Sequence, residues 1–190
     1  MTETVTIQMI TGVSPTYHDV TSIRFCTRDD YNPGVNDPCK VPTSSYYYSY
    51  WVTLCLYLTG TFTDISNVQF STSGNIKTAW GPDVVMLIGI RDSDDNGCPI
   101  GSYQQAAGTQ GLTGYYIKDG TNGHAYYKSQ TASPADCDNY PTGNKLLLDS
   151  THYSASGSRT KCAVIQTRHG QNAVHGDKSI EYLVFSYDVV

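Results

Sequence analysis

Residues 51–58, Trp51-Val52-Thr53-Leu54-Cys55-Leu56-Tyr57-Leu58, decide the fold class of this 190-residue chain. Successive side chains of a β-strand point to opposite faces of its sheet. One face of this stretch is therefore wholly aliphatic and holds Val52, Leu54, Leu56 and Leu58. The opposite face is mixed and holds Trp51, Thr53, Cys55 and Tyr57. We predict a strand that packs its aliphatic face on the core, because a slip of one residue would expose that face to water.

Similar short runs recur along the whole chain. They are rich in Tyr, Thr, Val and Ile, and Gly, Asn, Asp and Pro separate them. No stretch shows a sustained helical repeat of apolar residues, so sheets packed face to face must form the core. We expect strands at Thr2–Ile10, Thr21–Thr27, Trp51–Leu58, Ile65–Phe70, Val84–Ile90, Tyr115–Lys118, Ala125–Lys128, Lys145–Asp149, Thr160–Arg168 and Ile180–Val189. We predict one all-β domain over residues 1–190: a two-sheet β-sandwich, jelly-roll or Ig-like, with about ten strands and little helix.

Two segments carry more specific expectations. The run Ile180–Val189 is apolar on both faces, with Leu183, Phe185 and Tyr187 on one and Ile180, Tyr182 and Val184 on the other. We therefore expect this strand to be central and covered on both sides. Residues Gly101–Gly114 are small, polar and rich in Gly and Gln, which predicts a long loop or an extended arm.

Composition argues against several classes of function. Charged residues make up 15% of the chain and the formal net charge is -5, whereas soluble domains are about 25% charged. The chain offers no basic stripe for phosphates, so we expect no binding to nucleic acid. Its apolar runs, such as Val84–Ile88, are much shorter than the roughly 20 residues needed to cross a bilayer, so we expect no membrane insertion. Met1–Ile10 lacks the features of a signal peptide. Either the chain folds in the cytoplasm and later meets oxidising surroundings, or it is a mature form whose leader was removed.

The chain contains an even number of cysteines: Cys26, Cys39, Cys55, Cys98, Cys137 and Cys162. No Cys-x-x-Cys motif is present, so zinc ribbons and thioredoxin chemistry have no support. An even count in a domain of this size favours disulfides. The preferred pairs, chosen from loop and strand positions, are Cys26–Cys39, Cys98–Cys137 and Cys55–Cys162. Buried free thiols are the alternative.

The sharpest local motif is Asp92-Ser93-Asp94-Asp95-Asn96-Gly97. Oxygen ligands at alternate positions can converge on a hard cation, so Asp92, Asp94 and Asn96 are candidate calcium ligands. Tyr103 stands where an EF-hand loop carries Glu, which excludes an EF-hand. An Asx-stabilised turn is the alternative. We expect no other cofactor, because the five histidines lack the spacing of metal ligands.

No motif favours catalysis. No serine lies in Gly-x-Ser-x-Gly. The carboxylate pairs Asp29-Asp30, Asp94-Asp95 and Asp136/Asp138 are better explained by turns than by glycoside hydrolysis, which needs two carboxyl groups at a defined separation. We therefore expect a protein that is not an enzyme and that acts by binding.

The aromatic run from Tyr46 to Trp51 is the candidate interface, and its members are Tyr46, Tyr47, Tyr48, Tyr50 and Trp51. Tyrosine and tryptophan offer a large contact area at low entropic cost, which suits protein packing or stacking on sugars. The alternative is that these rings cap the edge of the sandwich.

From about Tyr50 to the C-terminus the chain resembles small, β-rich structural proteins encoded among the head genes of tailed phages and related viruses. The resemblance rests on turn and strand phrases: Ser49-Tyr50-Trp51, Leu58-Thr59-Gly60-Thr61-Phe62, Ile65-Ser66-Asn67-Val68, Asp95-Asn96-Gly97-Cys98-Pro99, Gly108-Thr109-Gln110-Gly111, residues 119–127 and Phe185-Ser186-Tyr187-Asp188. It supplies no site residues. It implies a virion component that decorates the capsid surface.

The expected function is accordingly that of a non-enzymatic virion structural protein that binds and stabilises the capsid shell. Its expected partners are further copies of itself, as a homo-oligomer such as a trimer, and a major capsid protein or another virion protein. The expected location is the virion surface after folding in the host cytoplasm. The alternative is a secreted, extracellular carbohydrate-binding or adhesive module, in which the aromatic run and the calcium-like loop would bind the ligand.

Overall fold

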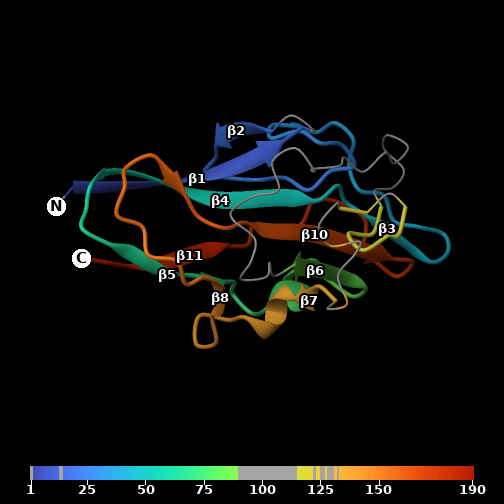
Figure 1. The fold of residues 1–190 in the computed structure, drawn as a ribbon. Coiled ribbons are helices and arrows are strands. Elements are labelled where there is room, and N and C mark those ends of the chain that lie inside the picture. Colours follow the sequence, from blue (N-terminus) through green and yellow to red (C-terminus); the bar gives the residue numbers. More distant parts are fainter. Residues whose placement is uncertain are drawn as a thin grey trace.

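A computed structural model describes residues 2–12, 15–89, 115–121, 123–124, 127, 131 and 133–190 of the chain. These residues form two antiparallel β-sheets, together with one α-helix of five residues (Figure 1). The prediction of an all-β fold with two sheets and little helix is therefore confirmed.

The large sheet has eight strands within the described ranges, in the order β2-β1-β4-β10-β6-β7, with β3 paired to β10 and β9 paired to β4. Its strands are β1 (Thr2–Thr11), β2 (Thr16–Asp19), β3 (Tyr46–Tyr48), β4 (Val52–Thr61), β6 (Val84–Gly89), β7 (Ala135–Asp136), β9 (Ser158–Arg159) and β10 (Ala163–Gly170). The small sheet has the order β11-β5-β8 and consists of β5 (Ile65–Ser71), β8 (Leu146–Asp149) and β11 (Val184–Val189). The helices are α1 (Ile76–Trp80) and the short 3-10 helix η2 (Cys137–Asn139).

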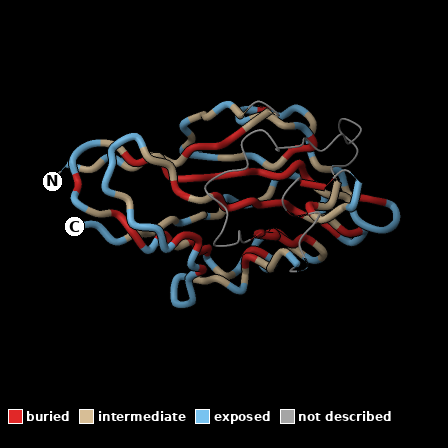
Figure 2. Tube along the Cα trace, in the orientation of Figure 1, coloured by how far each residue is buried: buried red, intermediate tan, exposed pale blue. Residues whose placement is uncertain are grey.

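Strand β4 packs on the core as its sequence predicts. Val52 and Leu54 belong to the main apolar cluster, which also contains Phe70 of β5. Leu56 and Leu58 pack in a second cluster with residues of the same strand β5. The aliphatic face of β4 therefore lies between the two sheets, and Figure 2 shows the buried residues following the central strands.

The opposite face of β4 is also buried, although its mixed composition did not indicate this. Trp51, just before the strand, and Cys55 within it are both 0% exposed. Ile117 and Tyr127 pack against Trp51, while Tyr17 packs beside Cys55. Segments distant in sequence thus cover the centre of the large sheet on its second face.

A buried amide, Gln166 of β10, joins three parts of the chain where β3 ends and β4 begins. Gln166 is 0% exposed. Its Nε2 donates to the carbonyl of Ser49 at 2.9 Å and also to the carbonyl of Tyr115, and its Oε1 accepts from the Ile117 amide at 2.9 Å. The Ser49 hydroxyl in turn accepts from the Thr167 amide at 2.9 Å. These side chains replace the ladder hydrogen bonds that are interrupted between β3 and β4.

Some expected strands are absent. Residues 21–27 contribute only an isolated bridge between Cys26 and Pro38, and residues 115–118 form turns and coil. The short strands β2, β3, β7 and β9 were not expected, because runs of two to four residues are too brief for an alternating pattern. The expected strand at 125–128 falls mostly outside the described residues.

Strand β11 is an edge strand within the described part of the chain, so the prediction that it is central is wrong. It pairs only with β5. Leu183 and Phe185 pack against the main cluster, but Ile180, Tyr182 and Val184 are 86%, 73% and 42% exposed. Periodicity correctly identified two apolar faces. Periodicity could not reveal that only one of these faces has a covering layer among the residues that the structure describes.

The two ends of the described chain meet at the turn between β4 and β5. Thr2 pairs with Thr61, and the amide of Val190 donates to the carbonyl of Asp64 at 2.9 Å. Both ends lie on the same side of the molecule in Figure 1. Gly60 sits at this junction with φ of 90°, and a Cβ atom there would lie 2.2 Å from the Thr2 carbonyl oxygen.

We predict that Gly60→Ala is strongly destabilising, because it combines a disfavoured positive φ with a backbone clash. Two matched variants separate these causes. Gly157 has the same φ of 90° but a Cβ atom there would meet nothing within 4 Å, and Gly143 has neither constraint. We expect Gly157→Ala to cost about 1–2 kcal/mol and Gly143→Ala to be neutral or slightly stabilising. Gly60→Ala should exceed both in urea unfolding, and equal costs for Gly60→Ala and Gly157→Ala would contradict the clash.

Candidate functional site

The strongest candidate for a functional surface is an exposed apolar strip near the C-terminus, formed by Ile180, Tyr182 and Val184. We call these residues the C-terminal strip. They alternate with Leu183 and Phe185, which point into the core. Alternate residues of an extended chain face opposite ways. Because Leu183 and Phe185 are partly buried against the core, the side chains of the strip face solvent. Large apolar side chains that are this exposed and this close together are typical of an interaction surface.

Specific contacts hold the chain that carries the strip. The indole Nε1 of Trp80 donates to the carbonyl of Ser179 at 2.9 Å. The Ser73 hydroxyl donates to the carboxylate of Glu181 at 2.7 Å. Since these contacts flank Ile180 directly, the strip is presented in a defined position despite its exposure.

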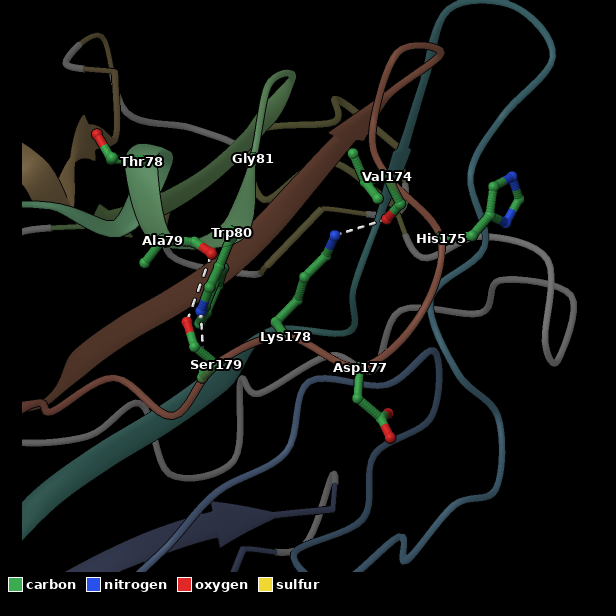
Figure 3. A pocket seen from close by; sticks show the side chains of 9 residues that line it. All are labelled: Thr78, Ala79, Trp80, Gly81, Val174, His175, Asp177, Lys178 and Ser179. Carbon is green, nitrogen blue, oxygen red and sulfur yellow. Dashed lines mark hydrogen bonds between the residues drawn. The ribbon is translucent and has the colours of Figure 1, made fainter.

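A shallow groove of about 240 Å³ lies next to the strip. Its lining residues come from the end of α1 and from the segment before the strip: Thr78, Ala79, Trp80, Gly81, Val174, His175, Asp177, Lys178 and Ser179. In Figure 3 the Lys178 side chain reaches towards the carbonyl of Val174, to which its Nζ donates. The groove is open and its lining is mixed, so it extends the exposed surface of the strip and does not form an enclosed substrate pocket.

The aromatic run predicted as an interface is largely internal. Tyr50 is 3% exposed and Trp51 is 0% exposed, so neither offers a surface to a partner, and their assignment to the interface is corrected. Their rings pack with Ile117 and Tyr127, which come from a segment that sequence pattern did not connect to them.

The three tyrosines of β3 lie nearer the surface. Tyr48 is half-buried beside the ring of Tyr116, at 5.3 Å between centroids, and burial raises its pKa. Tyr47 is also half-buried, and Tyr46 is exposed with the Arg168 guanidinium 4.5 Å from its ring centroid. Tyr46, which is 47% exposed, is thus the most exposed member of the predicted interface.

The calcium candidates Asp92, Asp94 and Asn96 lie outside the described residues, as does the predicted arm at 101–114. Within the described ranges, no group of three or more His, Cys, Asp or Glu side chains is arranged to hold a metal ion.

The preferred cysteine pairs are not formed. Four cysteines carry reduced thiols: Cys26, Cys39, Cys55 and Cys137. Each of the three predicted pairs contains at least one of them, so the three predicted pairs are wrong. Cys162 is disulfide-bonded, and Cys98 lies outside the described residues. Burial explains why thiols are stable here: it raises the pKa of Cys39 to about 12 and that of Cys137 well above its usual value.

The carboxylates considered for catalysis have structural roles where they are described. Both oxygens of Asp138 accept amides at the start of α1, from Ile76 at 2.8 Å and from Lys77 at 3.0 Å. Asp136 caps η2 and forms an ion pair with Lys77. Asp29 accepts the amide of Gly12 at 2.6 Å. These carboxylates, which sequence pattern attributed to turns, therefore anchor the backbone.

Asp149 is the most deeply buried carboxylate of the described chain, at 1% exposure, and no sequence pattern indicated it. It accepts hydrogen bonds from the amides of Thr151 and Lys161 and from the hydroxyl of Tyr153, at 2.7–2.9 Å. Burial by itself raises the pKa of Asp149, but these hydrogen bonds outweigh it and leave the pKa below its usual value. The ionised carboxylate of Asp149 thus holds the chain between β8 and β10 in place.

His169 of β10 is held in the neutral form. Burial, together with the nearby charge of Lys178, lowers its pKa to about 4. Its Nε2 lies 3.0 Å from the Thr167 hydroxyl. With this pKa, His169 carries no positive charge near neutral pH, and one of its ring nitrogens keeps its hydrogen.

Comparison with known proteins gives no relative from which a function can be transferred: no protein-family model, curated protein or solved structure matches this chain. Among the residues the structure describes, no helix is long and apolar enough to pass through a membrane.

We predict that acid destabilises the protein in two separable pH ranges. The unfolded chain takes up a proton at His169 near pH 6.5 but the native chain only near pH 4, so stability falls as the pH drops between these values, by up to about 3 kcal/mol. The pKa of Asp149 is lowered instead, so its contribution is present above its ordinary value of 3.8 and is lost below it.

Urea unfolding between pH 7 and pH 3 measures both effects. His169→Gln should remove the dependence between pH 6.5 and pH 4. Asp149→Asn should remove the dependence at lower pH and cost about 2–4 kcal/mol at pH 7, since it places an amide where three donors converge. An unchanged profile in His169→Gln would show that His169 is accessible to protons in the native state.

We also predict the labelling pattern of the thiols. Iodoacetamide added to unfolded, unreduced protein should modify Cys26, Cys39, Cys55 and Cys137, as detected by mass spectrometry. Cys26, Cys39 and Cys137 should react slowly in the native protein, because burial raises the pKa of each thiol and so keeps it protonated. Protein reduced beforehand is the control for complete labelling, and protection of both Cys26 and Cys39 in the unfolded, unreduced sample would restore their predicted pairing.

Proposed function

We propose that this chain is a non-enzymatic structural protein of a virion, which decorates the capsid surface and stabilises the shell through contacts made by the C-terminal strip. Its partners are further copies of the chain and a major capsid or other virion protein. The single observation that carries the proposal is the exposure of Ile180 and Tyr182, at 86% and 73%, on a firmly anchored segment.

The energetics favour a partner on this surface. Burying a large apolar side chain stabilises an association by about 1.5–3 kcal/mol. The strip offers such side chains next to one another, and the hydrogen bonds of Ser179 and Glu181 order the segment before binding. Because the ordering entropy is already lost in the free protein, more of the burial energy remains for association.

The composition suits a protein that packs against many neighbouring subunits in a repeated array. The chain has 16 tyrosines and only 15% charged residues, and interfaces favour Tyr while their centres are poor in charge. The resemblance of the sequence to phage head proteins points the same way. Two buried polar side chains of the described core, Asp149 and Gln166, are engaged in hydrogen bonds that hold the backbone.

The extracellular adhesive module is the alternative, and it draws less support. Its proposed sugar platform was the aromatic run, in which Tyr50 and Trp51 are buried. Its second element, the calcium-like loop, falls outside the described residues.

We predict that the double variant Ile180→Ser/Tyr182→Ser keeps the melting temperature of the parent but loses at least tenfold in binding to capsid shells from the native source, because it removes apolar contact area and no core packing. Sedimentation of shells with added protein measures binding, and cryo-EM of the pellet measures occupancy. Val35→Ser is the matched control, since Val35 is 77% exposed at a different site. Failure of the parent protein to bind shells, together with its absence from purified particles, would overturn the proposed function.

A further inference from the structure

The C-terminal strip continues an open sheet edge. Among the described residues, strand β11 pairs only with β5, on one side, and no backbone hydrogen bond joins residues 180–183 to another segment. Natural edge strands are usually protected by lysine, proline or a bulge. From Ser179 to Val190 the chain has no lysine and no proline. The register irregularity against β11 arises from an extra residue on β5, where Asn67 has φ of 52°, so β11 itself is regular.

We propose that this edge pairs with the same edge of a second copy of the chain, in antiparallel orientation, about a two-fold axis at Leu183. The inference rests on the proposed function and names the partner of the same surface. The pairing would join the three-stranded sheets of the two copies into one continuous sheet. A two-fold contact of this kind uses the same patch on both subunits and closes on itself.

The pattern of faces restricts the register of this pairing. Directly opposed residues of an antiparallel pair lie on the same face of the sheet. The axis must therefore pass through a residue position, because an axis between two positions would set outward side chains opposite inward ones. With the axis at Leu183, Tyr182 lies opposite the partner's Val184, and Ile180 lies opposite the partner's Ser186. The apolar strips of the two copies then form one surface.

Charge complementarity selects Leu183 among the possible positions. With the axis there, Lys178 of each copy lies opposite Asp188 of the other, which gives two symmetric pairs of opposite charge. An axis at Tyr182 would place Lys178 opposite Ser186 and leave both charges unmatched. An axis at Val184 would place Ile180 opposite Asp188, an apolar side chain against a carboxylate. The register at Leu183 alone among these three matches Lys178 with Asp188.

The environment of the two charges permits this contact. In the single chain, Lys178 Nζ donates to the carbonyl of Val174, and the Asp188 carboxylate accepts from Nδ2 of the Asn67 side chain at 2.7 Å. Asp188 is exposed, and the residues from Asp177 to Leu183 contain no turn. Asp177 is engaged with Arg24 at 3.2 Å, and Glu181 with Ser73, so these carboxylates do not compete for Lys178.

Sedimentation velocity tests the pairing. The parent chain should shift with concentration towards twice its mass of 20.8 kDa, over the micromolar range typical of weak transient dimers, up to about 100 µM. Tyr182→Arg should abolish the shift, because it places two like charges near the axis. Lys178→Glu and Asp188→Lys should each weaken dimerisation at least tenfold, since each sets like charges opposite one another. Lys40→Glu, a reversal of an exposed charge outside the segment, is the control for net charge.

An equimolar mixture of Lys178→Glu and Asp188→Lys provides the decisive measurement. In a mixed dimer with the axis at Leu183, every reversed charge faces an opposite one, so the mixture should dimerise like the parent although neither variant does so alone. Melting temperatures confirm that each variant is folded. A parent chain that stays monomeric, a dimer that survives Tyr182→Arg, or a mixture that stays monomeric would each overturn the proposal. Binding of the parent to shells is measured separately, so failure of the dimer leaves the proposed function standing, whereas a dimer that binds no shell refutes the function alone.

Discussion

The side-chain amide of Gln166 is the interaction on which the centre of the fold depends. It lies in the gap between β3 and β4, where the regular ladder against β10 is interrupted, and it binds Ser49, Tyr115 and Ile117 at once. Each of these is a backbone group that burial would otherwise leave unsatisfied, at a cost of about 1–3 kcal/mol apiece. By fixing residues 115–117 to β10, Gln166 also places Ile117 over Trp51. One amide therefore connects the pairing of the large sheet with the covering of its second face.

The sequence pattern correctly predicted those features of the fold that are determined by residues close together in the chain. The alternation of Val52, Leu54, Leu56 and Leu58 specified the inner face of β4, because that face is determined by the strand itself. Burial of Trp51 depends on Ile117 and Tyr127, and no local pattern could show that those residues lie over it. The role of Asp149 was missed for the same reason, since its donors come from Thr151, Tyr153 and Lys161, along a loop with no regular repeat.

The same distinction accounts for the site. The aromatic run at 46–51 was chosen for its residue types and proved half internal, whereas Ile180 and Tyr182 were assigned to the core and proved to be exposed. Residue type indicates that burial of a side chain away from water is favourable in free energy. It does not indicate whether the covering surface belongs to the same molecule. An exposed apolar face on an anchored segment therefore indicates where a partner binds. Here the structure, and not the sequence pattern, located that face at Ile180 and Tyr182.

The pairing of β11 with β5 also bears on the order in which the molecule forms. Asn67 and Asp188, which are hydrogen-bonded across this pair, are 121 residues apart in sequence. Contacts between residues so far apart in sequence form late in folding. The chain loses conformational entropy when it closes the long loop, and this cost precedes the stabilisation that the contacts provide. On the ribosome, β5 emerges long before β11, the strand that completes its sheet. Until then the ring of Phe70 lacks its contact with the ring of Phe185. Synthesis of β11 is thus the step that completes the small sheet, and a nascent chain stalled shortly before it would present an unfinished sheet to chaperones and to other nascent chains.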